Sequence, residues 1–145
     1  ITRRVNQVSD ILHQDCGPTR SREVQPVDPR LLHRHVTDGI RSNCGSVYQH
    51  AGDEVVLSWP KKKGIEGGAA IRCFFAIRDY LDSRKDYYKS TYGVQPVFKA
   101  GVHVGWVTVA EVGVLKREIS YHGDTINTAA RIEGCCNDLQ RDLLI

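Results

Sequence analysis

The sequence contains no methionine, and it has no apolar run near the roughly 20 residues that a membrane-spanning helix needs. The basic N-terminal residues are not followed by an apolar segment, so we expect no signal peptide. The GxSxG, HExxH and GxxxxGK[ST] patterns are also missing, which argues against the common hydrolases, zinc proteases and P-loop proteins. We expect contact with a membrane only through segments outside these residues.

The spacing of the cysteines forms no known framework. The five are odd in number and include no CxxC pair, which argues against a disulfide scaffold and against a zinc ribbon. A reducing, cytoplasmic setting is the simplest interpretation. The net charge is +3, and the only basic cluster, residues 61–63, is too short to indicate nucleic acid and is predicted to be a solvated loop. An anionic small ligand is compatible with this charge.

Helical and strand patterns alternate along the chain without an internal repeat. A length of 145 residues fits a single domain. Residues 1–27 are poorly patterned, with at most a short strand at 7–12. A helix is predicted at 28–43, where Asp28 is a plausible N-cap and Pro29 takes the first helical position. Residues 46–60 have two strand-like halves around a turn at 51–53, which is typical of a hairpin.

The second half of the chain has the clearest periodicity. A helix is predicted from about residue 67 to 88, and its apolar face contains Ile71, Phe74, Phe75, Ile77 and Leu81. Residues 94–113 alternate as a glycine-containing pair of strands, residues 117–121 form a further short strand, and a helix starts near 124. The order predicts an α+β protein whose sheet is mostly antiparallel.

The stretch YHGDTINTAARIE, residues 121–133, has the chemistry of a ligand-binding helix. Asn127 and Arg131 are four residues apart and therefore share a helix face. The small residues 128–130 between them indicate close approach by another element or by a ligand. A guanidinium suits phosphate and an amide suits a sugar, although a solvated arginine is an equally good interpretation. Asp124 is expected to lie at or near the helix cap.

Other polar residues are less specific by themselves. Asp53, at the tip of the predicted hairpin, suits a hard cation, and Gly52-Asp53 is also an ordinary turn dipeptide. The six histidines form no recognised ligand spacing. His103 is predicted to lie in a strand and to be packed rather than catalytic.

Three stretches together resemble the catalytic domain of class III nucleotidyl cyclases, the adenylate and guanylate cyclase family. They are YQHAGDEVVLSW (48–59), FKAGVHVGWVTVAEVG (98–113) and YHGDTINTAARIE (121–133), which look like the metal-binding hairpin, the glycine-rich hairpin and the GDxxNxAAR helix of that family. Residues 72–81 and 84–101 look like the bacterial adenylate cyclase branch. The resemblance covers residues 28–145.

The resemblance implies a ferredoxin-like, palm-type fold with helices flanking the sheet. It implies that the ribose 3′-hydroxyl of ATP attacks the α-phosphate to give 3′,5′-cyclic AMP and pyrophosphate, with two Mg²⁺ or Mn²⁺ ions bound. It also implies a homodimer in which two carboxylates of one subunit meet the asparagine and arginine of the other, head to tail. The alternative is a degenerate cyclase-homology domain that binds nucleotide or a partner and dimerises without turnover.

Carried over to this sequence, the resemblance assigns Asp53 to a metal ion, Asn127 to the ribose and Arg131 to the reacting phosphate. The first metal carboxylate has two candidates. Asp10 has the better separation from Asp53 but lacks the following glycine and threonine, whereas Asp15, in DCGPT, has both but lies closer to Asp53. Asp10 is the preferred candidate.

Positions that read the purine in the family are occupied here by Gln49 and Ser120, which are uncharged, so ATP rather than GTP follows only from the branch resemblance. Lys116 or Arg117 is expected to bind phosphate or to face solvent. The sequence stops at RDLLI, before the strands that in the family supply a triphosphate-binding lysine.

Overall fold

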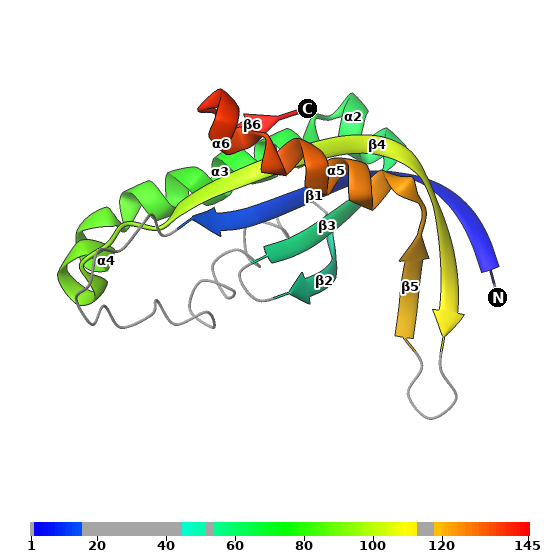
Figure 1. Cartoon of the computed structure of the whole chain (residues 1–145), viewed down its shortest axis with the longest axis horizontal. Coiled ribbons are helices and arrows are strands. Elements are labelled where there is room, and N and C mark those ends of the chain that lie inside the picture. The colour runs from blue at the N-terminus through cyan, green and yellow to red at the C-terminus, as the bar shows by residue number, and fades with distance from the viewer. Residues whose placement is uncertain (1, 16–44, 52–53, 113–117) are drawn as a thin grey trace.

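The computed structural model describes residues 2–15, 45–51, 54–112 and 118–145, which form a curved sheet flanked by helices (Figure 1). In chain order the elements are β1 (Thr2–Asp15), β2 (Ser46–Ala51), β3 (Glu54–Pro60), α2 (Lys61–Glu66), α3 (Ala69–Ser83), α4 (Lys85–Tyr92), β4 (Val97–Val112), β5 (Glu118–His122), α5 (Asp124–Gly134), α6 (Cys136–Leu139) and β6 (Leu143–Leu144). The helix predicted at 28–43 lies outside the described residues.

Within the described parts of the chain, six strands make one sheet in the order β2-β3-β1-β4-β5, with β6 beside β4. The short β4–β6 pairing is parallel, and the other pairings are antiparallel. The predicted α+β class and mostly antiparallel sheet are therefore confirmed. The strands β2 and β3 also form the predicted hairpin.

The strand β1 corrects the expectation that residues 1–27 contain at most a short strand. It runs for 14 residues and lies in the middle of the sheet, with β3 along one edge and β4 along the other. Its sequence is more polar than that of most central strands, so its local pattern is weak. Backbone pairing on both edges outweighs this weak local preference, because strand formation depends strongly on tertiary context.

The strand β4 corrects a second expectation, because residues 97–112 form one continuous strand rather than a hairpin. Gly101 and Gly105 lie on the same face of it, where a Cβ atom would collide with α5: at Gly101 with backbone atoms of Ala129 and Glu133, and at Gly105 with the side chain of Thr125. The glycines therefore make room for a helix and do not turn the chain.

The two faces of the sheet carry different helices. Alternate residues of β3 and β4 pack with α3 in the main core, which contains Val55, Leu57, Trp59, Ala69, Ala70, Cys73, Phe74, Ile77, Leu81, Tyr88, Phe98, Ala100 and Val102. Val56, between Val55 and Leu57, packs instead with Ala129 of α5. Because neighbouring strand residues point to opposite faces, α3 and α5 cover opposite sides of the sheet.

The predicted long helix is two helices, α3 and α4, separated at Arg84. The Ser83 hydroxyl donates a 2.6 Å hydrogen bond to the Tyr80 carbonyl, a local contact that competes with helix continuation. Phe75, predicted on the buried face, is 39% exposed. Phe75 is one residue further along the helix than the buried Phe74, so its side chain turns away from the core. On that outer side the Arg78 guanidinium lies 4.6 Å from the centre of the Phe75 ring.

The basic segment after β3 is also helical, although a solvated loop was expected. Pro60 ends β3 and precedes the first residue of α2, and its fixed backbone angle suits the start of a helix. The three lysines are exposed, as predicted, while Gly64 is buried. The helix thus keeps the expected solvation of the lysines and uses its glycine for packing.

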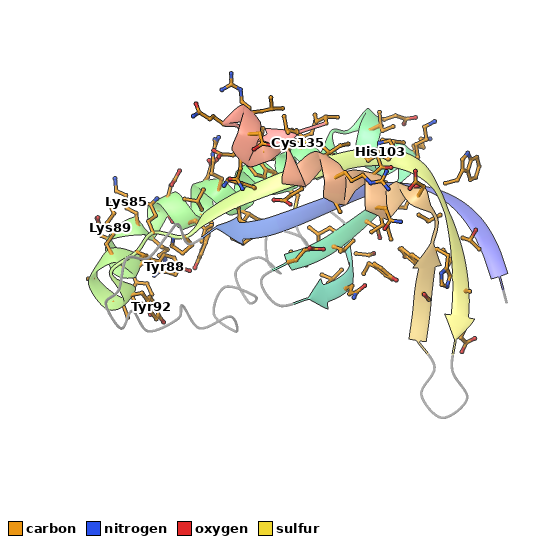
Figure 2. The ribbon with its side chains drawn as sticks, in the orientation of Figure 1. Lys85, Tyr88, Lys89, Tyr92, His103 and Cys135 are labelled. Atoms are coloured by element: carbon orange, nitrogen blue, oxygen red, sulfur yellow. The ribbon has the colours of Figure 1, made fainter. Side chains whose placement is uncertain are left out.

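At the far end of the molecule from His103, α4 carries a cluster of tyrosines (Figure 2). Tyr88 is buried in the main core, and Tyr87 and Tyr92 lie against it in ring contacts. Burial is the main cause that raises the pKa of the Tyr88 hydroxyl, and the neighbouring tyrosines add to it.

Every helix in the described residues is too short or too polar to cross a bilayer.

Candidate active site

The helix α5 begins where the chain leaves β5 through Gly123, whose φ of 144° favours glycine. Asp124 is the first helical residue rather than the cap, and its carboxylate accepts a hydrogen bond from the Thr128 hydroxyl at 3.3 Å. The Thr125 hydroxyl donates to the Trp106 carbonyl of β4 at 2.8 Å. This bond fixes the first turn of α5 to the sheet.

Small residues of α5 face the sheet. Thr125 and Ala129 are buried, four residues apart, over Gly105 and Gly101 of β4. The sequence left open whether another element or a ligand approaches the small residues of α5. The close neighbour of Ala129 is β4, because a side chain in place of Gly101 would meet the α5 backbone.

Asn127 and Arg131 lie on the opposite side of the same helix, and both side chains are exposed. Each follows a buried residue, Thr125 or Ala129, by two positions, which is about half a turn. The helix therefore presents the amide and the guanidinium together and away from its own sheet. The predicted common stripe is therefore present on α5.

Gln49 and Ser120, which the resemblance assigns to the purine, lie on the two edge strands of the described sheet. Gln49 is an exposed residue of β2, and Ser120 is a half-buried residue of β5. The strands β2 and β5 stand at opposite ends of the strand order. Nevertheless Tyr48, next to Gln49, stacks on Tyr121, next to Ser120, with ring centres 4.2 Å apart and ring planes 3° from parallel. The Tyr121 amide donates to the Tyr48 hydroxyl at 3.0 Å.

Sequence reasoning missed this tyrosine pair. Two aromatic residues that each adjoin a predicted purine-binding residue were a usable signal, because Tyr48 precedes Gln49 and Tyr121 follows Ser120. Their contact spans the strand order, so no local pattern connects them. His103, in contrast, lies in β4 and is partly buried, in agreement with its predicted strand position.

The two candidates for the first metal carboxylate occupy different rows of β1. Asp10 lies within the strand, opposite Leu57 and Val102, and Asp15 is its last residue, opposite Val97. Glu54, the first residue of β3, pairs with His13. In an antiparallel pair, moving back from Glu54 along β3 means moving forward along β1, toward Asp15 and away from Asp10.

Three candidates, Asp53, Lys116 and Arg117, lie outside the described residues. Across the ranges that the structure does describe, no group of three or more His, Cys, Asp and Glu side chains could hold a metal ion. The described part of the candidate site therefore consists of the exposed stripe of α5 and the two edge strands beside it.

Comparison with known proteins finds close relatives of this chain, although no protein-family model matches it. It is 40% identical over 110 residues to a protein named Adenylate cyclase 2 from Rhizobium meliloti (strain 1021). The match covers 76% of this chain and 30% of that protein, so the chain spans less than a third of the length of this relative.

Solved structures share the fold. A bacterial light-regulated adenylyl cyclase superimposes with a TM-score of 0.82 at 26% identity, over 99% of this chain and 43% of the other. The guanylyl cyclase Cya2 superimposes with a TM-score of 0.70 at 16% identity, over 91% of this chain and 71% of the other. The second likeness is one of fold alone.

Proposed function

Because this chain belongs to the class III nucleotidyl cyclase family as a catalytic domain homologous to adenylate cyclases, we propose that it converts ATP to 3′,5′-cyclic AMP and pyrophosphate. The observation that carries the proposal is the pairing of Asn127 and Arg131 on an exposed face of a helix whose other face is fixed to the sheet. The relative at 40% identity, named as an adenylate cyclase, supports ATP as the substrate.

The helix stripe gives the two side chains separate tasks. The Arg131 guanidinium stabilises the negative charge that grows on the α-phosphate as the ribose oxygen attacks it. The Asn127 amide orients the ribose so that its 3′-hydroxyl points at the phosphorus atom. Thr125 and Ala129 hold the helix on β4, so both groups are positioned before the nucleotide binds.

Both side chains point away from their own sheet, which supports a site completed by a second copy of the chain. In this arrangement the carboxylates of one subunit face the α5 stripe of the other, head to tail. The two sites of such a dimer are equivalent, because the same pair of surfaces meets twice. Activity should then depend on protein concentration in the range where dimers dissociate.

Carboxylates of the β1–β3 region would hold the divalent ions, Mg²⁺ or Mn²⁺, since hard cations prefer oxygen ligands. Asp53 comes immediately before Glu54, and the register of Glu54 with His13 favours Asp15 over Asp10 as its companion. We therefore propose Asp15 in the role for which the sequence preferred Asp10. When bound, the ions lower the pKa of the attacking hydroxyl and neutralise the triphosphate.

Gln49 and Ser120 are proposed to read the purine edge. Both side chains can donate and accept hydrogen bonds, so they suit the adenine amino group and ring nitrogen without a charged residue. Guanine presents a different pattern of donors and acceptors, and Gln49 can also rotate to match it. Selectivity for ATP is therefore expected to be a preference and not an absolute exclusion of GTP.

The proposal is tested by incubating the purified protein with Mn²⁺ and either ATP or GTP and identifying the products by mass. Cyclic AMP is expected from ATP. Arg131→Ala should lower the rate on the order of 100-fold or more, the cost of losing one preorganised donor to transition-state charge. Arg78→Ala removes an exposed arginine from α3 and should leave the rate unchanged.

The second candidate is a homologous domain that binds nucleotide without turnover. The uncharged residues at positions 49 and 120 favour it, because they offer weaker recognition than charged groups. It predicts that ATP raises the melting temperature while no cyclic product forms at any protein concentration. That combination of results would replace the first proposal with this one.

A further inference from the structure

The exposed edge of β5 has an unusual partner. This strand pairs with β4 on one side and, in the described residues, ends the strand order on the other. An edge amide normally bonds to water or to another strand. The Tyr121 amide instead donates to the Tyr48 hydroxyl of β2, the strand at the opposite end of the order. The curved sheet thus has its two edges joined by one hydrogen bond and one ring stack.

Residues that join the edges are sequence neighbours of the proposed site residues. Tyr48 packs on the small cluster of Val56 and Ala129, and so do Ile126 and Ala130 of α5. The stacked tyrosines adjoin the proposed purine-binding residues, because Tyr48 precedes Gln49 and Tyr121 follows Ser120. In α5, Ile126 precedes Asn127 and Ala130 precedes Arg131. Movement of the stack relative to α5 would therefore move purine-reading residues relative to the phosphate-binding ones.

The backbone of β2 is irregular immediately before Gln49. The pairing of β2 with β3 is irregular between Val47 and Gln49, so Tyr48 sits at a bulge. A bulge leaves a residue outside the regular ladder and often re-aims a side chain. Here the bulge residue is the one that reaches β5. The irregularity is thus associated with the stack and lies immediately before Gln49.

We propose that the Tyr48–Tyr121 pair is a positioning element for purine selection. The stack and the hydroxyl-to-amide bond fix the distance between the strands that carry Gln49 and Ser120, and Tyr48 fixes both to α5. The tyrosines act through these neighbours and need not touch the nucleotide. This inference rests on the proposed nucleotide site and adds what determines its base preference.

The test measures binding of 3′-deoxy-ATP and 3′-deoxy-GTP, which cannot cyclise, to the full chain with Mg²⁺. Tyr48→Leu and Tyr121→Leu remove the stack and should change the ratio of the two dissociation constants by about tenfold, since small misplacements at a site are costly. Tyr48→Phe keeps the ring and loses only the hydroxyl. It should have a smaller effect on the ratio and speed hydrogen exchange at the Tyr121 amide.

Tyr87→Leu is the matched control, because Tyr87 is an exposed tyrosine of α4 with ring contacts to its neighbours. It should leave the ratio unchanged. Equal losses of affinity for both nucleotides, with an unaltered ratio, would overturn the inference and leave the proposed function intact. Failure of the unmodified chain to bind either nucleotide would instead overturn the proposed function and the inference with it. If the leucine variants do not fold, the ratio of dissociation constants measured with Tyr48→Phe decides, and an unaltered ratio overturns the inference.

Discussion

The first residue of β3, Glu54, is the reference point for choosing between Asp10 and Asp15, because it directly follows Asp53 in the sequence. Glu54 pairs with His13 of β1, and Asp10 lies three residues before His13, opposite Leu57 inside β3. At about 3.3 Å per residue this is about 10 Å along the strand. Asp15 lies two residues after His13, toward the end of β1 that runs past the first residue of β3.

Asp15→Asn should therefore abolish metal-dependent cyclic AMP formation, with a loss of about 100-fold or more, because it removes a charge from the ion site while keeping the side-chain shape. Asp10→Asn should keep most of the activity. Initial rates over a series of Mn²⁺ concentrations measure both variants. An inactive Asp10→Asn beside an active Asp15→Asn would restore the assignment that the sequence favoured.

Tyr88 gives a residue-level prediction about pH. Its pKa is raised in the folded chain, so the folded state holds this proton more tightly than the unfolded state does. The resulting stability is fully present below the ordinary tyrosine pKa of about 10 and is lost as the pH rises through the higher folded value. Tyr88→Phe should flatten this loss. Urea unfolding midpoints between about pH 8 and pH 11 test it, with Tyr87→Phe as an exposed control.

Some features of single residues could be predicted from the sequence, and others could not. Asn127 and Arg131 were predictable as a pair, because four-residue spacing places side chains on one helix face regardless of the rest of the fold. The neighbour of Ala129 was not, because Gly101 is distant in sequence and only the folded sheet brings it near. The Tyr48–Tyr121 stack was hidden for the same reason.

At the scale of elements, the contact between α5 and β4 positions the site. Gly101→Ala would place a methyl group against the backbone of α5, which cannot rotate away as a side chain can. We expect a loss of about 1–3 kcal/mol in unfolding free energy, the usual cost of overpacking. Gly134→Ala is the matched control, because nothing lies within 4 Å of that position.

Alanine at 134 should be neutral or slightly stabilising, since alanine favours helices over glycine. Chemical denaturation of both variants provides the comparison. If Gly101→Ala were as stable as the unmodified chain, α5 would have to shift away from β4. The stripe of Asn127 and Arg131 would then move as well, and cyclic AMP formation would reveal this.

Elements with strong local signals were predictable from the sequence, and elements made by long-range pairing were not. The face of α3 follows helical periodicity, and Phe74, Ile77 and Leu81 are buried as predicted. The strand β1 has no comparable pattern and exists because β3 and β4 pair with its two edges. The unbroken course of β4 was hidden because glycine in a sequence indicates a turn as readily as a close helix contact.

At the scale of the whole molecule, a shared site makes a prediction about mixtures. Asp15→Asn and Arg131→Ala damage opposite halves of the proposed site, so a mixed dimer contains one intact site and one doubly damaged site. An equal mixture with random pairing should recover about a quarter of the unmodified activity. Mixing Arg131→Ala with Asn127→Ala should recover none, because both changes damage the same half. Recovery in this second mixture would contradict the head-to-tail arrangement.

The central position of β1 has a consequence for how the chain acquires its fold. Its pairs with β4 run from Thr2 with Ala110 to Asp15 with Val97, so residues near the start must meet residues made much later. Such high contact order slows folding, because a long loop must close before the pairing stabilises it. During synthesis β1 must wait for β4 to leave the ribosome. The chain therefore completes the middle of its sheet late, and the edge of β1 that β4 covers needs protection from aggregation until then.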